Sequence, residues 1–230
     1  MDIRELPLRY LALRWCMHHV CLTGALICLL SNFLFPIASA DGAEKRIVVL
    51  GDSLTAGYGV SKLEAYPALL QKKIEDAGLK WKVANGGRSG DTTKSGLSRL
   101  NWLLKKPADM LIIALGGNDG LRGLSSDAMR VNLKAMIDLA REGSPDIQIV
   151  LAGMQMPDNM GPEYVKAFKA VYPDLAKEED LSLIPFLLEG VGGSEELNQD
   201  DRIHPNEAGH KAIAETVWKV VEPLLLTPSQ

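Results

Sequence analysis

The stretch IVVLGDSL, residues 47–54, decides the fold and points to the chemistry. Its four consecutive apolar residues, 47–50, are typical of a strand that is buried on both faces of a parallel sheet. The run ends in Gly-Asp-Ser, which places the hydroxyl of Ser53 at the carboxyl end of this strand. Open α/β sheets build their ligand sites at that edge. Ser53 is therefore a candidate nucleophile.

Away from this strand, short apolar runs alternate with amphipathic runs whose apolar residues recur at helical spacing. This alternation predicts one α/β domain, a three-layer α/β/α sandwich with a mainly parallel five-stranded sheet. The pair Ser125-Ser126 and the single residue Asn206 can cap two of the helices. The predicted strands span residues 46–50, 81–84, 109–115, 147–152 and 181–184, and the predicted helices span residues 65–77, 92–105, 125–141, 163–177 and 206–225.

The first 40 residues have the pattern of a secretory signal. Residues 20–30 form a strongly apolar core, and the small residues that end at Ala40 are typical of a cleavage site, which predicts a mature chain of residues 41–230. The alternative is an uncleaved membrane anchor, but this core is too short to span about 30 Å of hydrocarbon. We expect no stable membrane span in the mature chain and a periplasmic or secreted location. Met17 is an alternative start that gives a more usual signal.

Cysteine usage and charge narrow the function classes. All three cysteines, Cys16, Cys21 and Cys28, lie in the leader, so no disulfide framework is expected in the mature chain. Without the leader, 22 basic and 27 acidic residues remain, which argues against nucleic acid as a partner. No Cys/His cluster has the spacing of metal ligands. Residues 51–59 contain no phosphate-binding or dinucleotide-binding glycine pattern. We therefore expect no metal and no cofactor.

A serine hydroxyl is a poor nucleophile unless a base accepts its proton during attack. His204 is the candidate base, because two of the other three histidines lie in the leader and His210 lies in the first turns of the last predicted helix. Asp201 stands three residues before His204, a spacing at which its carboxylate reaches Nδ1 in a tight turn and leaves Nε2 for Ser53. Asp200 is a competing carboxylate.

Four blocks follow one another along the chain: GDSL at 51–54, SGD at 89–91, GGND at 116–119 and DRIHP at 201–205. Together they resemble the SGNH (GDSL) hydrolase superfamily, in particular its bacterial thioesterase I, lysophospholipase and arylesterase group. The resemblance covers residues 46–225. It implies a flavodoxin-like SGNH hydrolase fold and a serine esterase, and it favours Asp201 over Asp200 as the partner of the histidine.

The resemblance also implies an oxyanion hole with three donors. These are the backbone N–H groups of Ser53 and Gly90 and the side-chain amide of Asn118. The residue types agree with this role, because a glycine lets a backbone donor approach closely and an amide donates where a carboxylate could not.

A substrate pocket is expected beside Ser53, flanked in the resembling group by segments 119–124 and 154–165. The apolar content of these segments suits a fatty acyl chain, so the predicted reaction is hydrolysis of carboxylic esters and thioesters of fatty acyl groups, lysophospholipids included. Met154 and Met156 fit equally well as ordinary core residues. The candidate pocket residues are Asp119, Leu121, Leu124, Met154, Met156 and Met160.

Two other functions compete with this interpretation. A carbohydrate O-acetyl esterase would use the same three side chains, but it would need an open polar groove, and the two flanking segments are apolar. A non-catalytic binding relative would keep the fold with a broken triad, whereas the serine, histidine and aspartate are all present. The expected partners are small acyl esters or thioesters, and the expected state is a monomer.

Overall fold

The structure, a computed structural model, describes residues 44–227. Five strands form one sheet of order β2-β1-β3-β4-β5, and every neighbouring pair is parallel. This is the strand order of flavodoxin-like folds, so the predicted mainly parallel five-stranded sheet is confirmed. The strands are β1 (Lys45–Gly51), β2 (Trp81–Gly87), β3 (Met110–Ala114), β4 (Gln148–Ala152) and β5 (Ser182–Ile184).

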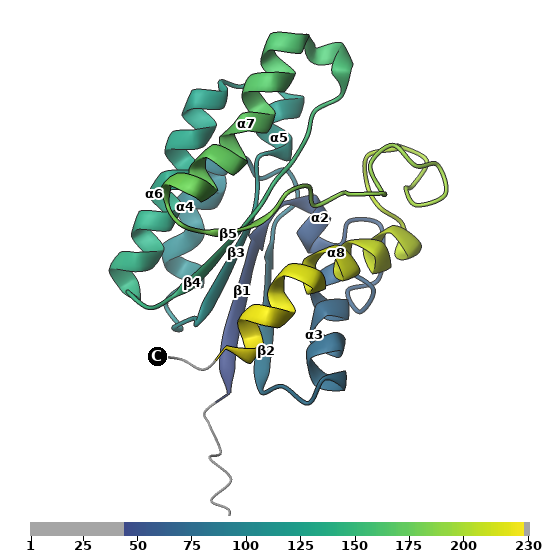
Figure 1. The fold of residues 1–230 in the computed structure, drawn as a ribbon. Helices are drawn as coiled ribbons and strands as arrows, with labels where there is room; N and C mark the ends of the chain where they lie inside the picture. Colours follow the sequence, from purple (N-terminus) through teal and green to yellow (C-terminus); the bar gives the residue numbers. More distant parts are fainter. Residues whose placement is uncertain (1–43, 228–230) are drawn as a thin grey trace, which may run out of the picture. The chain divides into compact units, whose positions relative to one another are not determined.

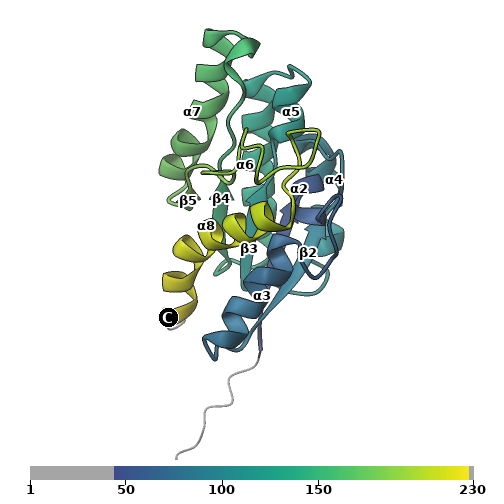
Figure 2. The same cartoon turned by 90° about the vertical axis from the view of Figure 1, so that its right-hand side faces the viewer.

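Helices cover both faces of the sheet (Figure 1). On one face, α3 (Tyr66–Asp76) packs against α8 (Glu207–Leu226), and these two helices lie in front in the view turned by 90° (Figure 2). The other face carries α4 (Thr93–Leu103), α6 (Ser126–Gly143) and α7 (Pro162–Glu178). The predicted three-layer α/β/α sandwich is thus confirmed. The shorter elements are α2 (Ser53–Ala56), α5 (Gly117–Leu121) and the 3₁₀-helix η2 (Asp158–Met160).

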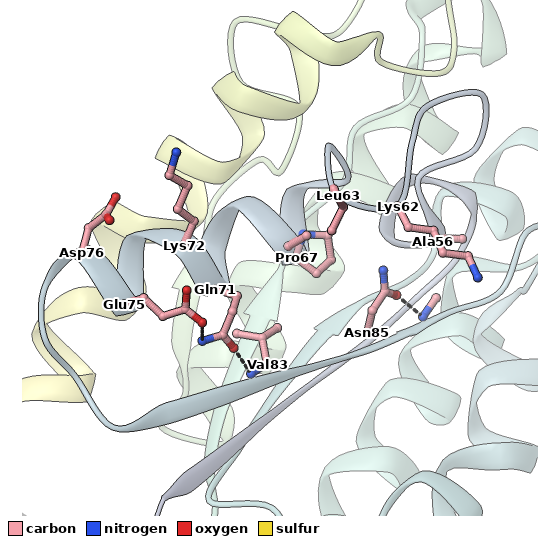
Figure 3. A pocket seen from close by; sticks show the side chains of 12 residues that line it. Ala56, Lys62, Leu63, Pro67, Gln71, Lys72, Glu75, Asp76, Val83 and Asn85 are labelled. Carbon is pink, nitrogen blue, oxygen red and sulfur yellow. Dashed lines mark hydrogen bonds between the residues drawn. The ribbon is translucent and has the colours of Figure 1, made fainter.

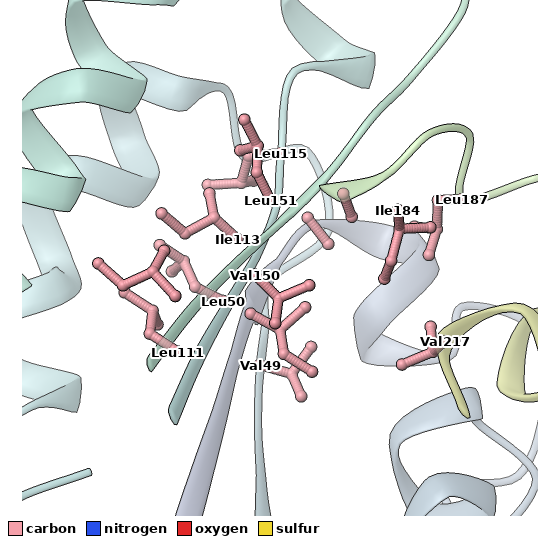
Figure 4. Packing of buried hydrophobic residues seen from close by; sticks show 14 of the residues in the cluster. Val49, Leu50, Leu111, Ile113, Leu115, Val150, Leu151, Ile184, Leu187 and Val217 are labelled. Carbon is pink, nitrogen blue, oxygen red and sulfur yellow. The ribbon is translucent and has the colours of Figure 1, made fainter. Parts of the chain in front are cut away.

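The core lies on both sides of the central strands (Figure 4). Val49 of β1 and Val150 of β4 lie on the side of Val217 in α8, whereas the next residue of each strand, Leu50 and Leu151, lies on the opposite side. All five side chains are fully buried. Because successive side chains of a strand alternate between faces, a run of consecutive apolar residues is what a sheet covered on both faces requires.

The sequence misplaced the end of β2. The strand was expected to stop at Ala84, but it continues through Gly86 and Gly87, two residues that are rare inside strands. Here the absence of a side chain is needed, because a Cβ on Gly87 would lie 2.2 Å from the backbone nitrogen of Ala56. The four-residue helix α2 therefore packs directly on the end of β2, and Gly87 makes that approach possible.

Caps at both predicted positions are confirmed, and of the pair Ser125-Ser126 it is Ser125 that caps α6. The hydroxyl of Ser125 accepts a hydrogen bond from the N–H of Ala128 at the start of α6. The side chain of Asn206 accepts from the N–H of Gly209 at the start of α8. Within residues 44–227, no helix is long and apolar enough to cross a membrane. The expected signal, residues 1–40, lies outside the described residues.

Candidate active site

Ser53 is the first residue of α2, directly after β1. The short helix folds back over the strand end, so a Cβ on Gly51 would lie 1.9 Å from the hydroxyl oxygen of Thr55. Asp52 caps the helix, and its Oδ1 accepts from the N–H of Leu54 at 3.0 Å. The glycine and the aspartate of the GDSL block thus shape the turn that presents the serine at the sheet edge.

Asp201 and His204 share one tight turn before α8. Oδ1 of Asp201 accepts from the backbone N–H groups of Ile203 and His204, both at 2.9 Å, and Oδ2 lies 2.6 Å from Nδ1 of His204. Arg202, inside this turn, has a φ of 59°, a left-handed conformation that costs about 1 kcal/mol or more for a residue with a side chain. The turn is therefore held by the hydrogen bonds of Asp201 despite local strain.

The imidazole joins this turn to the serine. Nε2 of His204 lies 3.0 Å from Oγ of Ser53, across 151 residues of sequence. The hydrogen bonds from the backbone N–H and the side chain of His204 and from the N–H of Ile203 lower the pKa of Asp201 to about 2. An ionised carboxylate only accepts hydrogen bonds, so Nδ1 carries the proton and Nε2 is free to accept from the serine hydroxyl. The structure thus brings Ser53, His204 and Asp201 into one hydrogen-bonded chain.

Gln199 ties the histidine loop to the serine loop. Its amide nitrogen donates to the carbonyl of Tyr58, just after α2, at 2.7 Å and to the carbonyl of Pro205 at 2.9 Å. Its backbone N–H donates to the carbonyl of His204 at 2.8 Å. No local pattern in the sequence marks this glutamine, because the loop of Tyr58, which it joins to its own loop, is distant along the chain.

The three expected oxyanion donors lie on loops at the same edge of the sheet. Ser53 follows β1, Gly90 lies in the loop after β2, and Asn118 lies in α5, just after β3. The amide nitrogen of Asn118 donates to the carbonyl of Asp91 at 3.0 Å and approaches Oδ2 of Asp52 at 3.3 Å. Asn118 thus contacts the residue after Gly90 and the residue before Ser53.

A buried ion pair fixes two of these loops to each other. The carboxylate of Asp91 is 2% exposed and binds the guanidinium groups of Arg99, at 2.5 Å, and Arg88, at 2.8 Å. Arg99 also donates to the carbonyl of Gly51 at 2.9 Å. Because buried charges must be paired, Arg99 of α4 holds the ends of β1 and β2 in a fixed relation.

A cavity of about 470 Å³ opens beside Ser53 and His204. Its walls are mainly apolar, and Asn118 is part of them. Three of the expected pocket residues line it: Leu121, Met154 and Met156. The sequence missed the contribution of the segment after β5 and of the histidine loop; the short apolar run after Pro185 was the available signal. The additional lining residues are Leu54, Gly117, Gln155, Pro157, Phe186, Leu188, Gly192, Gly193, Arg202 and Ile203.

The other three expected pocket residues do not line this cavity. Asp119 is 3% exposed, and its carboxylate accepts from the backbone N–H and the hydroxyl of Thr93, at 2.8 and 2.6 Å. Leu124 is 43% exposed, beyond the end of α5. Met160, in η2, packs against the hydrophobic core. We therefore leave Asp119, Leu124 and Met160 out of the proposed acyl pocket.

A larger cavity, of about 920 Å³, lies between α3 and β2 (Figure 3). Gln71 of α3 reaches across it: its Oε1 accepts from the N–H of Val83 at 2.7 Å, and its Nε2 donates to the carbonyl of Trp81 at 3.2 Å. The side chain therefore satisfies part of the open edge of β2. This cavity holds no serine or histidine, so its lining offers no nucleophile and base.

Burial raises the pKa of one carboxyl next to the nucleophile. Asp52 is 3% exposed, and burial raises its pKa to about 6, although the hydrogen bond from the N–H of Leu54 and the nearby imidazole of His204 oppose the rise. Among residues 44–227, no group of three or more His, Cys, Asp or Glu residues is placed to hold a metal ion.

These elements define a serine hydrolase site on a flavodoxin-like sheet, and comparison with known proteins agrees. Residues 49–212 match the model of the GDSL-like Lipase/Acylhydrolase family, and the chain belongs to this family. It is 42% identical to esterase TesA of Pseudomonas aeruginosa over 192 residues, which cover 82% of this chain and 94% of that protein.

Two further comparisons extend the match. The chain is 38% identical to thioesterase 1/protease 1/lysophospholipase L1 of Escherichia coli strain K12, over 84% of this chain and 91% of that protein. The crystal structure of TesA superposes with a TM-score of 0.75 at 41% identity and covers 78% of this chain and 99% of its own. The predicted resemblance to SGNH hydrolases is thereby confirmed.

Proposed function

We propose that this protein is a serine hydrolase that cleaves carboxylic esters and thioesters of fatty acyl groups. The observation that carries the proposal is the hydrogen-bonded chain from Oγ of Ser53 to Nε2 of His204, at 3.0 Å, and from Nδ1 of His204 to Oδ2 of Asp201, at 2.6 Å. It supplies a nucleophile, a base and the group that orients the base. The names of its relatives, an esterase and a thioesterase/lysophospholipase, support this reaction class.

In the proposed mechanism, Oγ of Ser53 attacks the acyl carbon while Nε2 of His204 takes the hydroxyl proton. The ionised Asp201 stabilises the imidazolium, and the carbonyl oxygen becomes an oxyanion. Collapse of the tetrahedral intermediate breaks the bond to the alcohol or thiol, which leaves with the proton from Nε2. Water then attacks the acyl-serine by the same route, and the carboxylic acid is released with Ser53 restored.

The oxyanion requires donors that are in place before the reaction. We propose the backbone N–H groups of Ser53 and Gly90 and the amide of Asn118. The position of Asn118 supports this choice, because its amide nitrogen bridges the loops that carry the other two donors.

The cavity next to Ser53 supports an acyl chain as the group that is bound. Phe186, Leu188, Met154 and Met156 supply apolar surface there, and methionine side chains adapt to flexible chains. An acetyl group would fill a small part of about 470 Å³, which argues against a carbohydrate O-acetyl esterase. The complete triad argues against a non-catalytic relative.

We also propose that residues 1–40 direct export and are removed after Ala40, and that the mature chain, residues 41–230, acts as a monomer in the periplasm or outside the cell. The support is the apolar core and the small-residue cleavage pattern of the leader. N-terminal sequencing of the exported protein tests the cleavage site, and an N-terminus other than Asp41 would contradict it.

The function is tested with p-nitrophenyl esters of increasing chain length, an acyl thioester, a lysophospholipid and an acetylated sugar. Wild-type protein should cleave medium and long acyl esters faster than the acetyl ester. Ser53→Ala should abolish labelling by a fluorophosphonate and reduce hydrolysis by several orders of magnitude with the fold intact. Hydrolysis that survives in Ser53→Ala would end the proposal, and a preference for the acetylated sugar would replace the substrate class.

A further inference from the structure

Asp52 stands next to the proposed nucleophile, but the mechanism above gives it no task. Its carboxyl group is buried at the end of β1. One oxygen, Oδ1, accepts from the N–H of Leu54 at 3.0 Å and caps α2. The other oxygen, Oδ2, faces the amide nitrogen of Asn118 at 3.3 Å. A capping residue needs only the first of these oxygens, so the second contact needs its own explanation.

The surroundings of Asn118 determine which end of its amide faces them. The two groups within reach of Nδ2 are the backbone carbonyl of Asp91, at 3.0 Å, and Oδ2 of Asp52, at 3.3 Å. A carbonyl and an ionised carboxylate can only accept hydrogen bonds. A reversed amide would place its own oxygen against both acceptors. The pair Asp52 and Asp91 therefore selects the orientation in which the nitrogen, the end that can donate, faces the serine loop.

The two acceptors differ in strength. The bond to the carbonyl of Asp91 has an ordinary length, whereas the 3.3 Å contact to Asp52 is longer than the usual 2.9–3.0 Å for this type of bond. The hydrogen that points toward Asp52 is thus weakly bound in the free enzyme. It is the one that an oxyanion formed at Ser53 can attract without breaking a strong bond.

We propose that Asp52 is a positioning residue that holds the side-chain amide of Asn118 in the orientation in which its nitrogen can donate to the oxyanion. The proposal rests on the proposed esterase function and adds a residue through which the oxyanion donor is set. Asp52 acts only through Asn118 in this scheme and touches no reacting atom. Its pKa, raised by burial to about 6, still leaves it mostly ionised, and thus a pure acceptor, at pH 8.

A double-mutant cycle tests the link, with kcat and KM measured on p-nitrophenyl butyrate at pH 8. Asp52→Asn puts a second amide against Asn118, so donor can face donor and the orientation is lost. It should lower kcat roughly tenfold or more with KM within about twofold of wild type, and Asn118→Ala should lower kcat by about 10²–10³. In the double variant, kcat should fall no further than in Asn118→Ala. Losses that multiply would overturn the proposal.

A matched control separates positioning from general damage to the fold. Asp119→Asn changes another buried aspartate, whose carboxylate binds Thr93. The loss of the contacts to Thr93 should lower the melting temperature of Asp119→Asn. Any decrease in kcat that it causes should multiply with the decrease caused by Asn118→Ala. Ser53→Ala is measured beside the cycle. If Ser53→Ala is inactive and the kcat losses of Asp52→Asn and Asn118→Ala multiply in the double variant, the inference fails and the esterase function stands. If Ser53→Ala is fully active, the esterase function itself fails.

A second variant covers the case in which Asp52→Asn does not fold. Asp52→Ser keeps a side-chain oxygen that can cap Leu54, because serine is a good N-cap, and it removes the second oxygen that faces Asn118. It should melt close to wild type and still lose kcat with KM retained. A folded Asp52→Ser variant with wild-type kcat would contradict the proposal.

Discussion

The ring of Tyr58 lies against the imidazole of His204, with 4.5 Å between the ring centroids and 43° between the planes. Asp201 and Ser53 each bond one ring nitrogen, but both bonds lie in the plane of the ring and leave its faces unsupported. Tyr58 comes from the turn after α2 and touches the ring face. It therefore limits the motion of the imidazole relative to Ser53, which begins the same helix.

Removal of this contact should slow the chemistry while the substrate still binds. We expect Tyr58→Ala to lower kcat roughly tenfold, because small errors in the placement of a catalytic group cost up to about 10²-fold. Tyr58→Phe keeps the ring and should retain most of the wild-type rate. Steady-state kinetics on a p-nitrophenyl ester measure both. Equal losses in the two variants would assign the effect to the hydroxyl and not to ring contact.

Gln199 offers a second test of how the two loops are held. Its side-chain amide bonds the carbonyls of Tyr58 and Pro205, and no other residue type has the same reach and donor pair. Gln199→Ala should lower kcat, by about tenfold or more, and increase hydrogen exchange at the backbone of residues 199–205. Gln199→Glu is the sharper control, since it has nearly the same shape but loses the donor. If Gln199→Glu keeps full activity, the donated bonds do not hold the site.

The sequence could predict some contacts of the proposed site and not others. Asp201 and His204 lie three residues apart in one turn, so their pairing follows from local geometry. The identity of Ser53 as their partner came from its place after an apolar strand and from family resemblance. Gln199 and Tyr58, which hold the loops together, carry no local pattern. Their roles follow from tertiary contacts that no spacing rule encodes.

The fold shows the same division. Continuous apolar runs predicted the three central strands β1, β3 and β4, because strands covered on both faces need such runs. The end of β2 at Gly87 was missed, since glycine disfavours strands unless a neighbour comes close, and that neighbour, Ala56 of α2, was not foreseeable. The order of the strands was also not readable, because the alternation of strands and helices is the same for several orders. The wall of the cavity at Phe186, just after β5, depends on that order.

The glycine at the end of β2 leads to a stability prediction. A Cβ at position 87 would meet backbone atoms of α2 at 2.2 Å, and backbone cannot move aside as a flexible side chain can. Gly87→Ala should destabilise the protein by roughly 1–3 kcal/mol, as overpacking does, and displace Ser53. Gly143, in α6, has open space around its Cβ position, so Gly143→Ala should be neutral or slightly stabilising. Urea unfolding and fluorophosphonate labelling of both variants provide the test.

Asp201 leads to a prediction on pH dependence. Hydrogen bonds from His204 and Ile203 hold the pKa of Asp201 at about 2, so this carboxylate stays ionised throughout the range from pH 5 to 9. Titration of Asp201 should therefore add no step to the pH profile of hydrolysis in this range. Asp201→Asn should reduce kcat by about 10⁴ at every pH in this range, as the tautomer of the histidine is no longer fixed. A loss in Asp201→Asn that disappears toward pH 5 would contradict an Asp201 that stays ionised throughout this range.

His210 leads to a prediction on stability in acid. It is fully buried in α8, its Nδ1 accepts from the backbone N–H of Tyr66 at 3.3 Å, and its Nε2 has no hydrogen-bond partner within the described part of the chain. Burial is the main cause that lowers its pKa from 6.5 to about 4, and the nearby imidazole of His204 adds to the effect. Between these two values the unfolded chain binds a proton that the folded protein does not.

Stability should therefore fall as the pH drops from about 6.5 to about 4 and level off below, because the unfolded state is favoured wherever it binds more protons. From pH 7.5 to 4.5 this one histidine should cost about 2 to 3 kcal/mol. Asp52 acts in the opposite direction. Its pKa in the folded protein is about 6, above the usual 3.8, so on acidification the folded state binds this proton before the unfolded state does. The free energy of unfolding is therefore measured in urea at both pH values for wild type and for His210→Gln. The contribution of Asp52 is the same in both proteins and cancels when the two changes with pH are compared. His210→Gln should lose less stability on acidification, and an equal loss in both proteins would show that His210 does not titrate in this range.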